Sequence, residues 1–167
     1  MDESDVVALT VTDAAGDFVD LYRGQYGRLV RALELSGASR PLAEDLAQEA
    51  FARTYRHWRR VREGVNPSGY PYRVAFRLLS KDRRARAAVP SVPLSIPYLT
   101  ATDEVVAGRD EVLQALRDLT VTQRAAVVLC LCVGFSSEEA ARALGIKAAT
   151  VRKQIERARP QLRVSLG

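Results

Sequence analysis

The side chains best suited to contact a ligand lie near the C-terminus, on a basic helix that the sequence predicts from about residue 148. Along this helix an apolar residue recurs at helical spacing and predicts a buried stripe: Val151, Ile155, Ala158 and Leu162. The opposite face would present Ala149, Lys153, Glu156 and Arg157, with Arg152 at its flank. Arginine and lysine on such a face can bond guanine edges or phosphates, so the pattern favours DNA as the ligand. The alternative is an ordinary helical hairpin whose charged face is only solvated.

A short helix and a glycine turn precede the basic helix and would position it. Ser136 is suited to be the N-cap of the short helix, and Glu139 can close a capping box onto the Ser136 amide. Gly145 stands where a helix needs a left-handed residue to end, and Ile146 can fold back into the core. Residues 135–159 therefore predict a helix-turn-helix element.

Charge is strongly segregated along the chain, although the formal net charge is only +5. Residues 51–90 hold 11 Lys and Arg against 2 acidic residues, and residues 142–167 hold 7 against 1. Residues 1–50 and 91–141 are acidic, with net charges of −6 and −4. Two separate basic blocks indicate two contacts with a polyanion such as DNA.

Composition argues against several functional classes. The hydrophobic content of 47% suits packed cores rather than a disordered chain. The longest apolar run, 125–135, is too short to span a bilayer, and the acidic N-terminus lacks a signal-peptide pattern. We therefore expect a cytoplasmic protein without membrane insertion.

Catalytic and metal-binding chemistry is not indicated either. Cys130 and Cys132 lie two apart in a predicted helix, which suits buried apolar roles better than a disulfide or a shared metal site. His57 is the only histidine, and no nucleophile, base and orienting group can be assembled around it. We expect no enzyme, no cofactor and no metal.

The periodicity predicts an all-α protein made of two small helical domains. Residues 1–16 lack a sustained period and are expected to form a disordered acidic tail before a first domain at 17–86. Residues 87–102 contain three prolines and no charge, which is typical of a flexible linker. The second domain, 103–167, would end in the helix-turn-helix.

Within these domains the breaks between helices are marked by turn residues. In the first domain, turn residues at 62–69 predict a loop between a long second helix and a third helix. Pro71 fits the third helix only if it lies in the first turn of that helix. In the second domain we expect helices over 105–119 and 121–133, and Thr120 with Gln123 makes a capping box for the latter.

Four segments carry a family pattern by their order and spacing. They are AEDLAQEAF at 43–51, RVAFRLLSKDRRAR at 73–86, LTVTQRAAVVL at 119–129 and EEAARALGIKAATVRKQIERAR at 138–159. Together they resemble the extracytoplasmic-function (ECF) group of the sigma-70 family, the two-domain bacterial initiation factors. The resemblance implies a factor that directs core RNA polymerase to promoters, with −10 recognition and melting in 17–86 and −35 recognition in 103–167.

The resemblance also implies protein partners. One exposed helix face would dock on the clamp helices of core RNA polymerase, through Asp45, Gln48, Glu49 and Arg53. A helix-dipole role is the alternative for this face, because acidic residues lie early and arginines late in the helix. The polymerase flap would receive the C-terminal domain, and a cognate anti-sigma factor is a further expected partner.

For promoter DNA the resemblance implies three sets of contacts. The loop at 62–69 would receive a base extruded from the −10 element, with contacts from Arg62, Asn66 and Ser68. The basic helix after it would follow the phosphate backbone, unless its face is only solvated, through Arg73, Arg77, Lys81, Arg83 and Arg84. The −35 element would meet the exposed side of the last helix at Thr150, Arg152, Lys153, Glu156 and Arg157. Four aromatic residues near the loop could stack on bases, although residues at helical spacing more often lie in the core: Trp58, Tyr70, Tyr72 and Phe76. We favour core positions for Trp58 and Phe76.

Some residues depart from the family pattern and predict an unusual −35 preference. Leu119-Thr120 stands where Leu-Pro is usual, and Lys147 and Lys153 replace small hydroxyl residues. Glu156 can accept from cytosine, pair with Arg152 or repel phosphate. Pro160 should end or bend the last helix.

Two other functions fit parts of the sequence. A stand-alone helix-turn-helix transcriptional regulator would dimerise on a palindrome, but it has no need of the basic block at 51–90 and no dimerisation helix is evident. A helical adaptor would use its charged faces to bind proteins only. No motif identifies the promoter sequence, the inducing signal or the anti-sigma factor.

Overall fold

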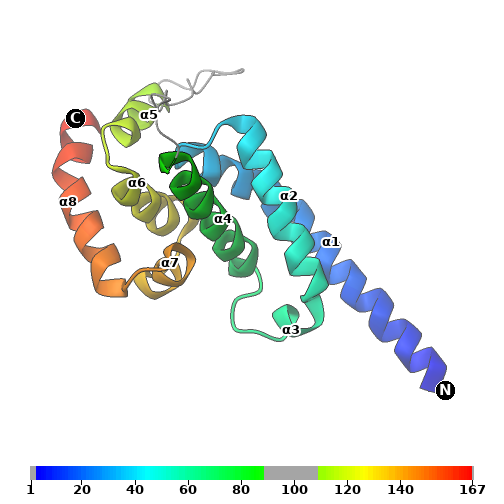
Figure 1. The fold of residues 1–167 in the computed structure, drawn as a ribbon. Coiled ribbons are helices and arrows are strands. Elements are labelled where there is room, and N and C mark those ends of the chain that lie inside the picture. The colour runs from blue at the N-terminus through cyan, green and yellow to red at the C-terminus, as the bar shows by residue number, and fades with distance from the viewer. Residues whose placement is uncertain (1–2, 89–108, 167) are drawn as a thin grey trace.

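All regular elements in the described ranges of the computed structural model are helices, which confirms the all-α prediction. The structure describes residues 3–88 and 109–166, with side chains placed for 15–88 and 111–163. The N-terminal elements are α1 (Glu3–Leu35), α2 (Arg40–Arg56), α3 (Trp58–Arg62) and α4 (Gly69–Ala87). The C-terminal elements are α5 (Arg109–Arg117), α6 (Val121–Val127), the π-helical η1 (Val128–Val133), α7 (Ser137–Leu144) and α8 (Ala148–Leu166) (Figure 1).

Helix α1 begins earlier than the sequence predicts. It starts at Glu3, so the prediction of a disordered tail over 1–16 is wrong for the backbone of residues 3–16, the part that the structure describes. Figure 1 shows the first turns of α1 extending beyond the rest of the molecule. The apolar period behind the prediction begins only at Phe18, whose ring packs 5.5 Å from Trp58 and 6.4 Å from Phe51. Helix propagation does not need such a period, because each added residue gains a backbone hydrogen bond once a nucleus exists.

Helices α1, α2 and α4 enclose the core of the N-terminal domain. Leu29, Phe51, Phe76 and Leu79 are at most 2% exposed, and Trp58 is 7% exposed. The predicted core positions of Trp58 and Phe76 are thus confirmed. Burying a side chain of this size contributes roughly 1.5–3 kcal/mol, so this cluster fixes which faces of α2 and α4 meet solvent.

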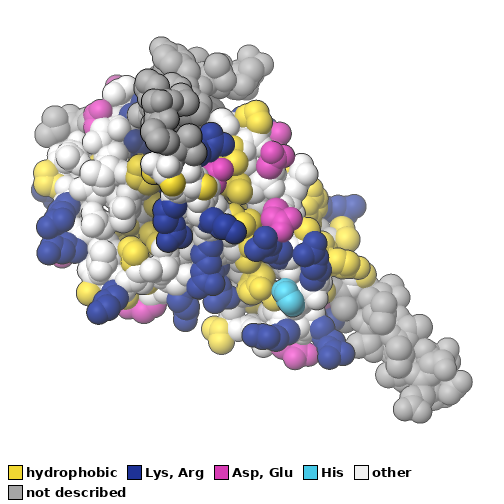
Figure 2. Space-filling model, viewed as in Figure 1, with side chains coloured by type: hydrophobic (Ala, Val, Ile, Leu, Met, Phe, Trp, Pro, Cys, Tyr) yellow, Lys and Arg dark blue, Asp and Glu magenta, His cyan; other side chains and the backbone are white. Residues whose placement is uncertain are grey.

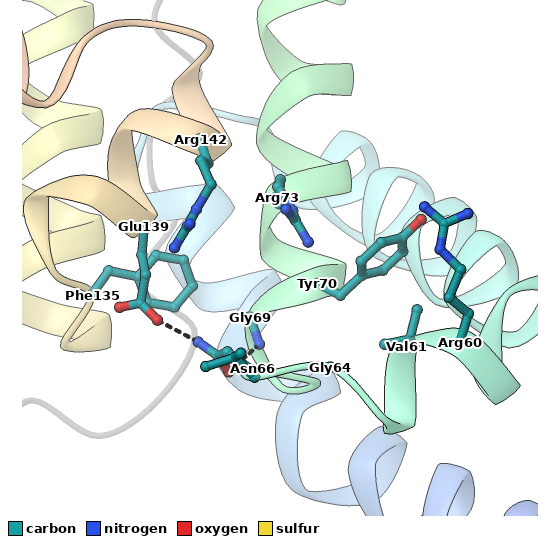
Figure 3. A pocket seen from close by; sticks show the side chains of 11 residues that line it. Arg60, Val61, Gly64, Asn66, Gly69, Tyr70, Arg73, Phe135, Glu139 and Arg142 are labelled. Carbon is teal, nitrogen blue, oxygen red and sulfur yellow. Dashed lines mark hydrogen bonds between the residues drawn. The ribbon is translucent and has the colours of Figure 1, made fainter.

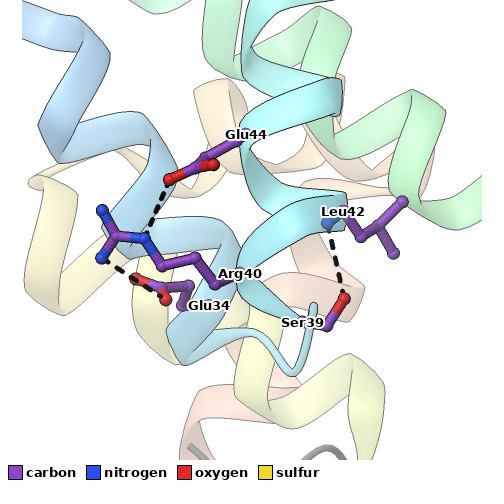
Figure 4. A network of polar contacts seen from close by, with 5 residues as sticks. All are labelled: Glu34, Ser39, Arg40, Leu42 and Glu44. Carbon is purple, nitrogen blue, oxygen red and sulfur yellow. Dashed lines mark hydrogen bonds and ion pairs between the residues drawn. The ribbon is translucent and has the colours of Figure 1, made fainter. Parts of the chain in front are cut away.

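The turn between α1 and α2 is held by short-range polar contacts (Figure 4). Ser39 is the extended N-cap of α2, and its hydroxyl accepts the N–H of Leu42 at 3.4 Å. The Arg40 guanidinium lies 2.9 Å from the Glu44 carboxylate in α2 and 4.0 Å from that of Glu34 in α1. These contacts set the residue at which α2 starts and hence the orientation of its exposed face.

Gly37, in the same turn, has a left-handed backbone with φ 98°. An added Cβ would lie 3.0 Å from Nη1 of Arg124 and 3.3 Å from Nη2 of Arg83. We expect Gly37→Ala to lower the free energy of unfolding by about 1 kcal/mol, through backbone strain and crowding. Urea unfolding followed by circular dichroism measures the loss. Gly24→Ala is the control, because a Cβ at Gly24 meets nothing within 4 Å and alanine suits a helix, and equal losses in both variants would contradict the expectation.

The C-terminal domain begins with the predicted capping box. The Thr120 hydroxyl accepts the Gln123 N–H at 3.3 Å, and the Gln123 side chain accepts the Thr120 N–H at 3.0 Å. The single helix predicted over 121–133 is α-helical only to Val127 and continues as a π-helix to Val133. The apolar pattern could not separate the two forms, because both can turn one side of the same run to the core.

The two cysteines differ in their exposure to solvent. Cys130 is half-buried and Cys132 is exposed, so the predicted buried role is wrong for Cys132. Helical residues two apart point to different sides, which lets only one of them turn to the core.

Among the residues that the structure describes, no group of three or more His, Cys, Asp or Glu could hold a metal ion. None of the helices in this part of the chain is long and apolar enough to cross a membrane.

The two domains pack directly against each other. Helix α4 lies against α7 (Figure 1), and α1 contacts η1. The ring of Tyr72 in α4 meets that of Phe135, just before α7, edge to face at a centroid distance of 5.5 Å. Buried side chains of both domains belong to one continuous cluster. From residue 89 onward the predicted linker lies outside the described residues, and Ala87 ends α4.

Candidate nucleic-acid interfaces

Helices α7 and α8 form the predicted helix-turn-helix. The Ser136 hydroxyl accepts the Glu139 N–H at 3.1 Å, and the Glu139 carboxylate accepts the Ser136 N–H at 2.9 Å. Gly145 ends α7 in the left-handed conformation, with φ 69°. Val151 and Ala158 are fully buried, so one side of α8 is fixed to the core and the opposite side is left to solvent.

The predicted −35 residues lie on that solvent side. Thr150 is half-buried at the start of α8, and four side chains are exposed: Arg152, Lys153, Glu156 and Arg157. The Arg152 guanidinium lies 3.0 Å from the Glu138 carboxylate of α7, and the structure thus pairs it with Glu138 rather than with Glu156. Backbone contact and Arg152 hold the pKa of Glu138 below its usual range. Arg152 thereby ties α8 to α7.

Helix α8 does not end at Pro160. It continues to Leu166, so of the two predicted effects of Pro160, an end or a bend, the end is wrong. A proline removes one backbone donor inside a helix, which costs about 3 kcal/mol in an isolated helix. Buried Ala158 and half-buried Leu162, one on each side of the proline, pack against the core and offset that cost.

Four basic residues form a stripe along α4. Arg73, Arg77, Lys81 and Arg84 recur every three or four residues, which places them on one helix face. Arg77, Lys81 and Arg84 are exposed, and Arg73 is half-buried with its guanidinium 5.2 Å from the Tyr70 ring centroid. Figure 2 shows Lys and Arg side chains gathered across α4 and around α3 on this face of the molecule. Such a stripe can follow a phosphate backbone.

Arg83 lies apart from this stripe. Its guanidinium is half-buried and donates to the Ser36 carbonyl, at the end of α1. Burial, together with the nearby charge of Arg124, lowers the pKa of Arg83. The geometry therefore indicates that Arg83 fixes α4 to the α1–α2 turn rather than extending the exposed basic face.

The loop at 63–68 carries the predicted base-contacting residues. Asn66 is exposed, and its Oδ1 accepts the N–H of Gly69 at 2.9 Å. Ser68 is exposed and precedes α4 without a side-chain capping bond. Arg62, which ends α3, lies 3.6 Å from the Asp17 carboxylate of α1. The structure brings Asn66 and Ser68 together on the loop and directs Arg62 toward α1.

A pocket of about 360 Å³ lies between this loop and α7 (Figure 3). Its walls come from both domains and include Arg60, Tyr70, Arg73, Phe135 and Arg142. Across it, Nδ2 of Asn66 donates to Oε1 of Glu139 at 2.6 Å. Sequence reasoning missed this contribution of α7, because 73 residues separate the two partners and no local pattern links them.

The two tyrosines near the loop have different environments. Tyr70 is half-buried and lines the pocket, where its ring can meet a planar ligand. Tyr72 is only 2% exposed, and its hydroxyl donates to Oε1 of Gln25 at 3.1 Å. Burial raises the pKa of Tyr72. Tyr72 therefore belongs to the packed interface between the domains, whereas Tyr70 remains a candidate stacking residue.

The predicted polymerase-docking residues lie on the outer face of α2. Asp45, Gln48 and Arg53 are exposed and Glu49 is half-buried. Nε of Arg53 lies 2.6 Å from Oε1 of Glu49, and this contact lowers the pKa of Glu49. A helix-dipole role explains the order of charges along α2 but leaves the exposed face free to bind another protein.

Family comparisons match both halves of the chain. Residues 18–89 match the family described as sigma-70 region 2, and residues 109–162 match the one described as sigma-70, region 4. Over 92% of its length the chain is 36% identical to the ECF RNA polymerase sigma factor SigE of Mycolicibacterium smegmatis, of which it spans 65%. It is 33% identical to the ECF RNA polymerase sigma factor SigM of Mycobacterium tuberculosis, over 95% of this chain and 83% of that protein.

The fold is also found in solved structures. The sigma factor RpoE of Bartonella quintana, in complex with the anti-sigma factor NepR, matches with a TM-score of 0.70 at 23% identity, over 90% of this chain and 96% of that one. CnrH, in complex with the cytosolic domain of CnrY, matches with a TM-score of 0.59 at 23% identity, over 95% of each chain. Two matched regions in order, and relatives aligned over nearly the whole chain, lead to one conclusion. The chain belongs to the ECF group of the sigma-70 family of RNA polymerase sigma factors.

Proposed function

We propose that this chain binds core RNA polymerase and directs it to promoters with a −10 and a −35 element. The observation that carries the proposal is that each of the two sigma regions presents an exposed basic helix face, on α4 and on α8. A factor of this kind supplies recognition and strand opening and catalyses no covalent step. Promoter affinity without polymerase would be low, because each domain offers a small interface.

The −35 element would be read by α8. Its exposed Lys153 and Arg157 can donate to guanine edges or phosphates, and Arg152 can join them if it leaves Glu138. Thr150 at the start of the helix can bond a phosphate or a base. Glu156 can accept a hydrogen bond from cytosine, because Arg152 pairs with Glu138 and not with Glu156.

The −10 element would be held open by the N-terminal domain. The α4 stripe supplies charge for the backbone, and Asn66 and Ser68 supply hydrogen bonds to an extruded base. Tyr70 at the pocket wall supports the same assignment, because an aromatic ring can stack on such a base. Arg62 and Arg83 would act mainly by holding α3 and α4 in place.

Partners would bind the remaining faces. Asp45, Gln48, Glu49 and Arg53 would meet the polymerase clamp helices, and the C-terminal domain would meet the flap. Binding of core polymerase would place this chain in the cytoplasm. Two solved proteins with this fold are seen with an anti-sigma factor or a cytosolic partner domain, which supports a cognate anti-sigma factor for this chain.

Transcription from a library of −10 and −35 sequences tests the proposal. Core RNA polymerase should initiate at discrete sites only when this chain is added, and the selected templates should share two spaced elements. If core polymerase stays inactive while the chain alone retains a palindromic site, the proposal fails and the stand-alone helix-turn-helix regulator replaces it.

A further inference from the structure

We propose that Gly69 is a specificity-determining positioning residue, which orients the Asn66 amide so that only its Nδ2 donor faces an extruded −10 base. The inference rests on the proposed function, because it concerns the base that this loop would receive. It adds a residue without a side chain to the recognition machinery, and it states which chemical group of the base is read.

The hydrogen bonds fix the orientation of the Asn66 amide. Oδ1 accepts the backbone N–H of Gly69 at 2.9 Å, and Nδ2 donates to Oε1 of Glu139 at 2.6 Å. Turning the amide over would set Nδ2 against an N–H donor and Oδ1 against a carboxylate, so only one orientation satisfies both partners. The acceptor of the amide is thus used within the loop, and its donor points across the pocket (Figure 3).

This orientation of the Asn66 amide is possible only because residue 69 is a glycine and has no side chain. A Cβ at this position would lie 2.6 Å from Nδ2, 3.0 Å from Cγ and 3.3 Å from Oδ1 of Asn66. Gly69 is buried, and its three nearest contacts all belong to Asn66. The cheapest relief for an added methyl group is therefore rotation of the Asn66 side chain, which breaks the bond to the Gly69 N–H.

The backbone of Gly69 does not itself demand glycine. Its φ lies outside the left-handed region, and it is the first residue of α4, where alanine favours the helix. Glycine at position 69 is therefore required by the orientation of the Asn66 amide and not by the backbone conformation. This separates Gly69 from Gly37 and Gly145, whose left-handed conformations explain them.

The fixed amide predicts which base is disfavoured. An asparagine with both groups free can pair with adenine through N6 and N7, by accepting from the first and donating to the second. Here Oδ1 is turned to the Gly69 N–H, which excludes the bidentate pair, so adenine is left with a single bond from Nδ2 to a ring nitrogen, whereas each other base offers a carbonyl oxygen. The Glu139 oxygen shows the kind of group that this donor takes, a carboxylate or carbonyl oxygen. We therefore expect thymine, guanine or cytosine at the extruded position and selection against adenine.

Promoter-dependent transcription with each base at every −10 position tests this assignment. With wild-type protein, one position should give roughly tenfold less transcript for adenine, the effect of one lost base contact. Gly69→Ala and Asn66→Ala should both remove this discrimination. Gly27→Ala is the matched control, since a Cβ there meets nothing within 4 Å, and it should keep the wild-type profile.

The double variant separates positioning from a general effect on folding. In the Asn66→Ala background the atoms nearest to the new Cβ are gone, so Gly69→Ala should leave the base profile unchanged and raise the melting temperature. In the wild-type background Gly69→Ala should not raise the melting temperature. Retained discrimination in Gly69→Ala, or a further change of profile in the double variant, would overturn the proposal. Absence of initiation by the wild-type protein on every template would instead refute the proposed function.

Discussion

Replacing Arg77, Lys81 and Arg84 together by alanine should weaken promoter binding by the holoenzyme and flatten its salt dependence. All three side chains are exposed on the α4 stripe. Each phosphate contact contributes about 0.9 to the slope of log affinity against log salt on duplex DNA, and about 0.7 on a single strand. The slope should therefore fall by roughly 2–3. Between 50 and 200 mM salt, wild-type affinity should drop about 20–40 times more than that of the triple variant. Fluorescence binding of labelled promoter at several salt concentrations measures both quantities.

Two further variants control for charge and for domain contact. Arg86→Ala removes a charge that is paired with Asp82 at 2.8 Å and lies off the stripe, so the slope should stay near the wild-type value. Arg77 also donates to the Arg142 carbonyl at 3.3 Å, and the double variant of Lys81 and Arg84 leaves that contact intact. An unchanged slope in the double variant, with helical content retained, would show that the stripe is a solvated surface.

Features that depend on near neighbours were predictable from the sequence. Both capping boxes join residues three apart, Thr120 with Gln123 and Ser136 with Glu139, and the structure contains both. Gly145 follows the same logic, because a helix end demands a residue that tolerates positive φ. The core positions of Trp58 and Phe76 followed from helical spacing, which reports the buried side of an element.

Features that depend on distant partners were not predictable. The density of arginine in α4 assigned Arg83 to the DNA face, yet Arg83 lies about 100° around the helix from Arg84. Its partner, the Ser36 carbonyl, is 47 residues away. Charge counting does not distinguish a side chain that anchors a turn from one that faces solvent. The same limit hid the burial of Tyr72, because Phe135 covers it from the other domain.

The hydrogen bond between Asn66 and Glu139 would link base recognition by the loop to the packing of the two domains against each other, the closed state of the chain. Asn66 donates to Glu139 in the closed chain, and the same donor would contact an extruded base. Glu139 takes one of the two N–H groups of this amide and lines the same pocket, so α7 would compete with the base for the space beside Asn66. If Asn66 contacts a base in this space, the domains would have to separate first, and core polymerase would supply the binding energy for the separation.

The replacement Glu139→Gln should favour separation while it keeps the cap of α7. In wild type, one carboxylate oxygen accepts the Ser136 N–H and the other accepts from Asn66. Glutamine retains one acceptor for the cap, as Gln123 does in the other capping box, and turns an NH₂ group toward the Asn66 donor. Loss of this partly exposed, charge-assisted bond amounts to roughly 1–2 kcal/mol. The open population should therefore rise about 5–30-fold.

Binding of the isolated chain to a labelled single strand that carries its selected −10 sequence measures this change. Apparent affinity scales with the fraction of open chain, so it should rise about 5–30-fold in Glu139→Gln. Glu138→Gln is the matched control, because it removes the same charge from the adjacent residue, whose partner is Arg152 rather than Asn66. If both variants gain equally, the gain comes from net charge alone. If Glu139→Gln gains nothing while α7 stays folded, the bond to Asn66 does not hold the domains together, and the remaining contacts of Tyr72 and Phe135 carry the closure.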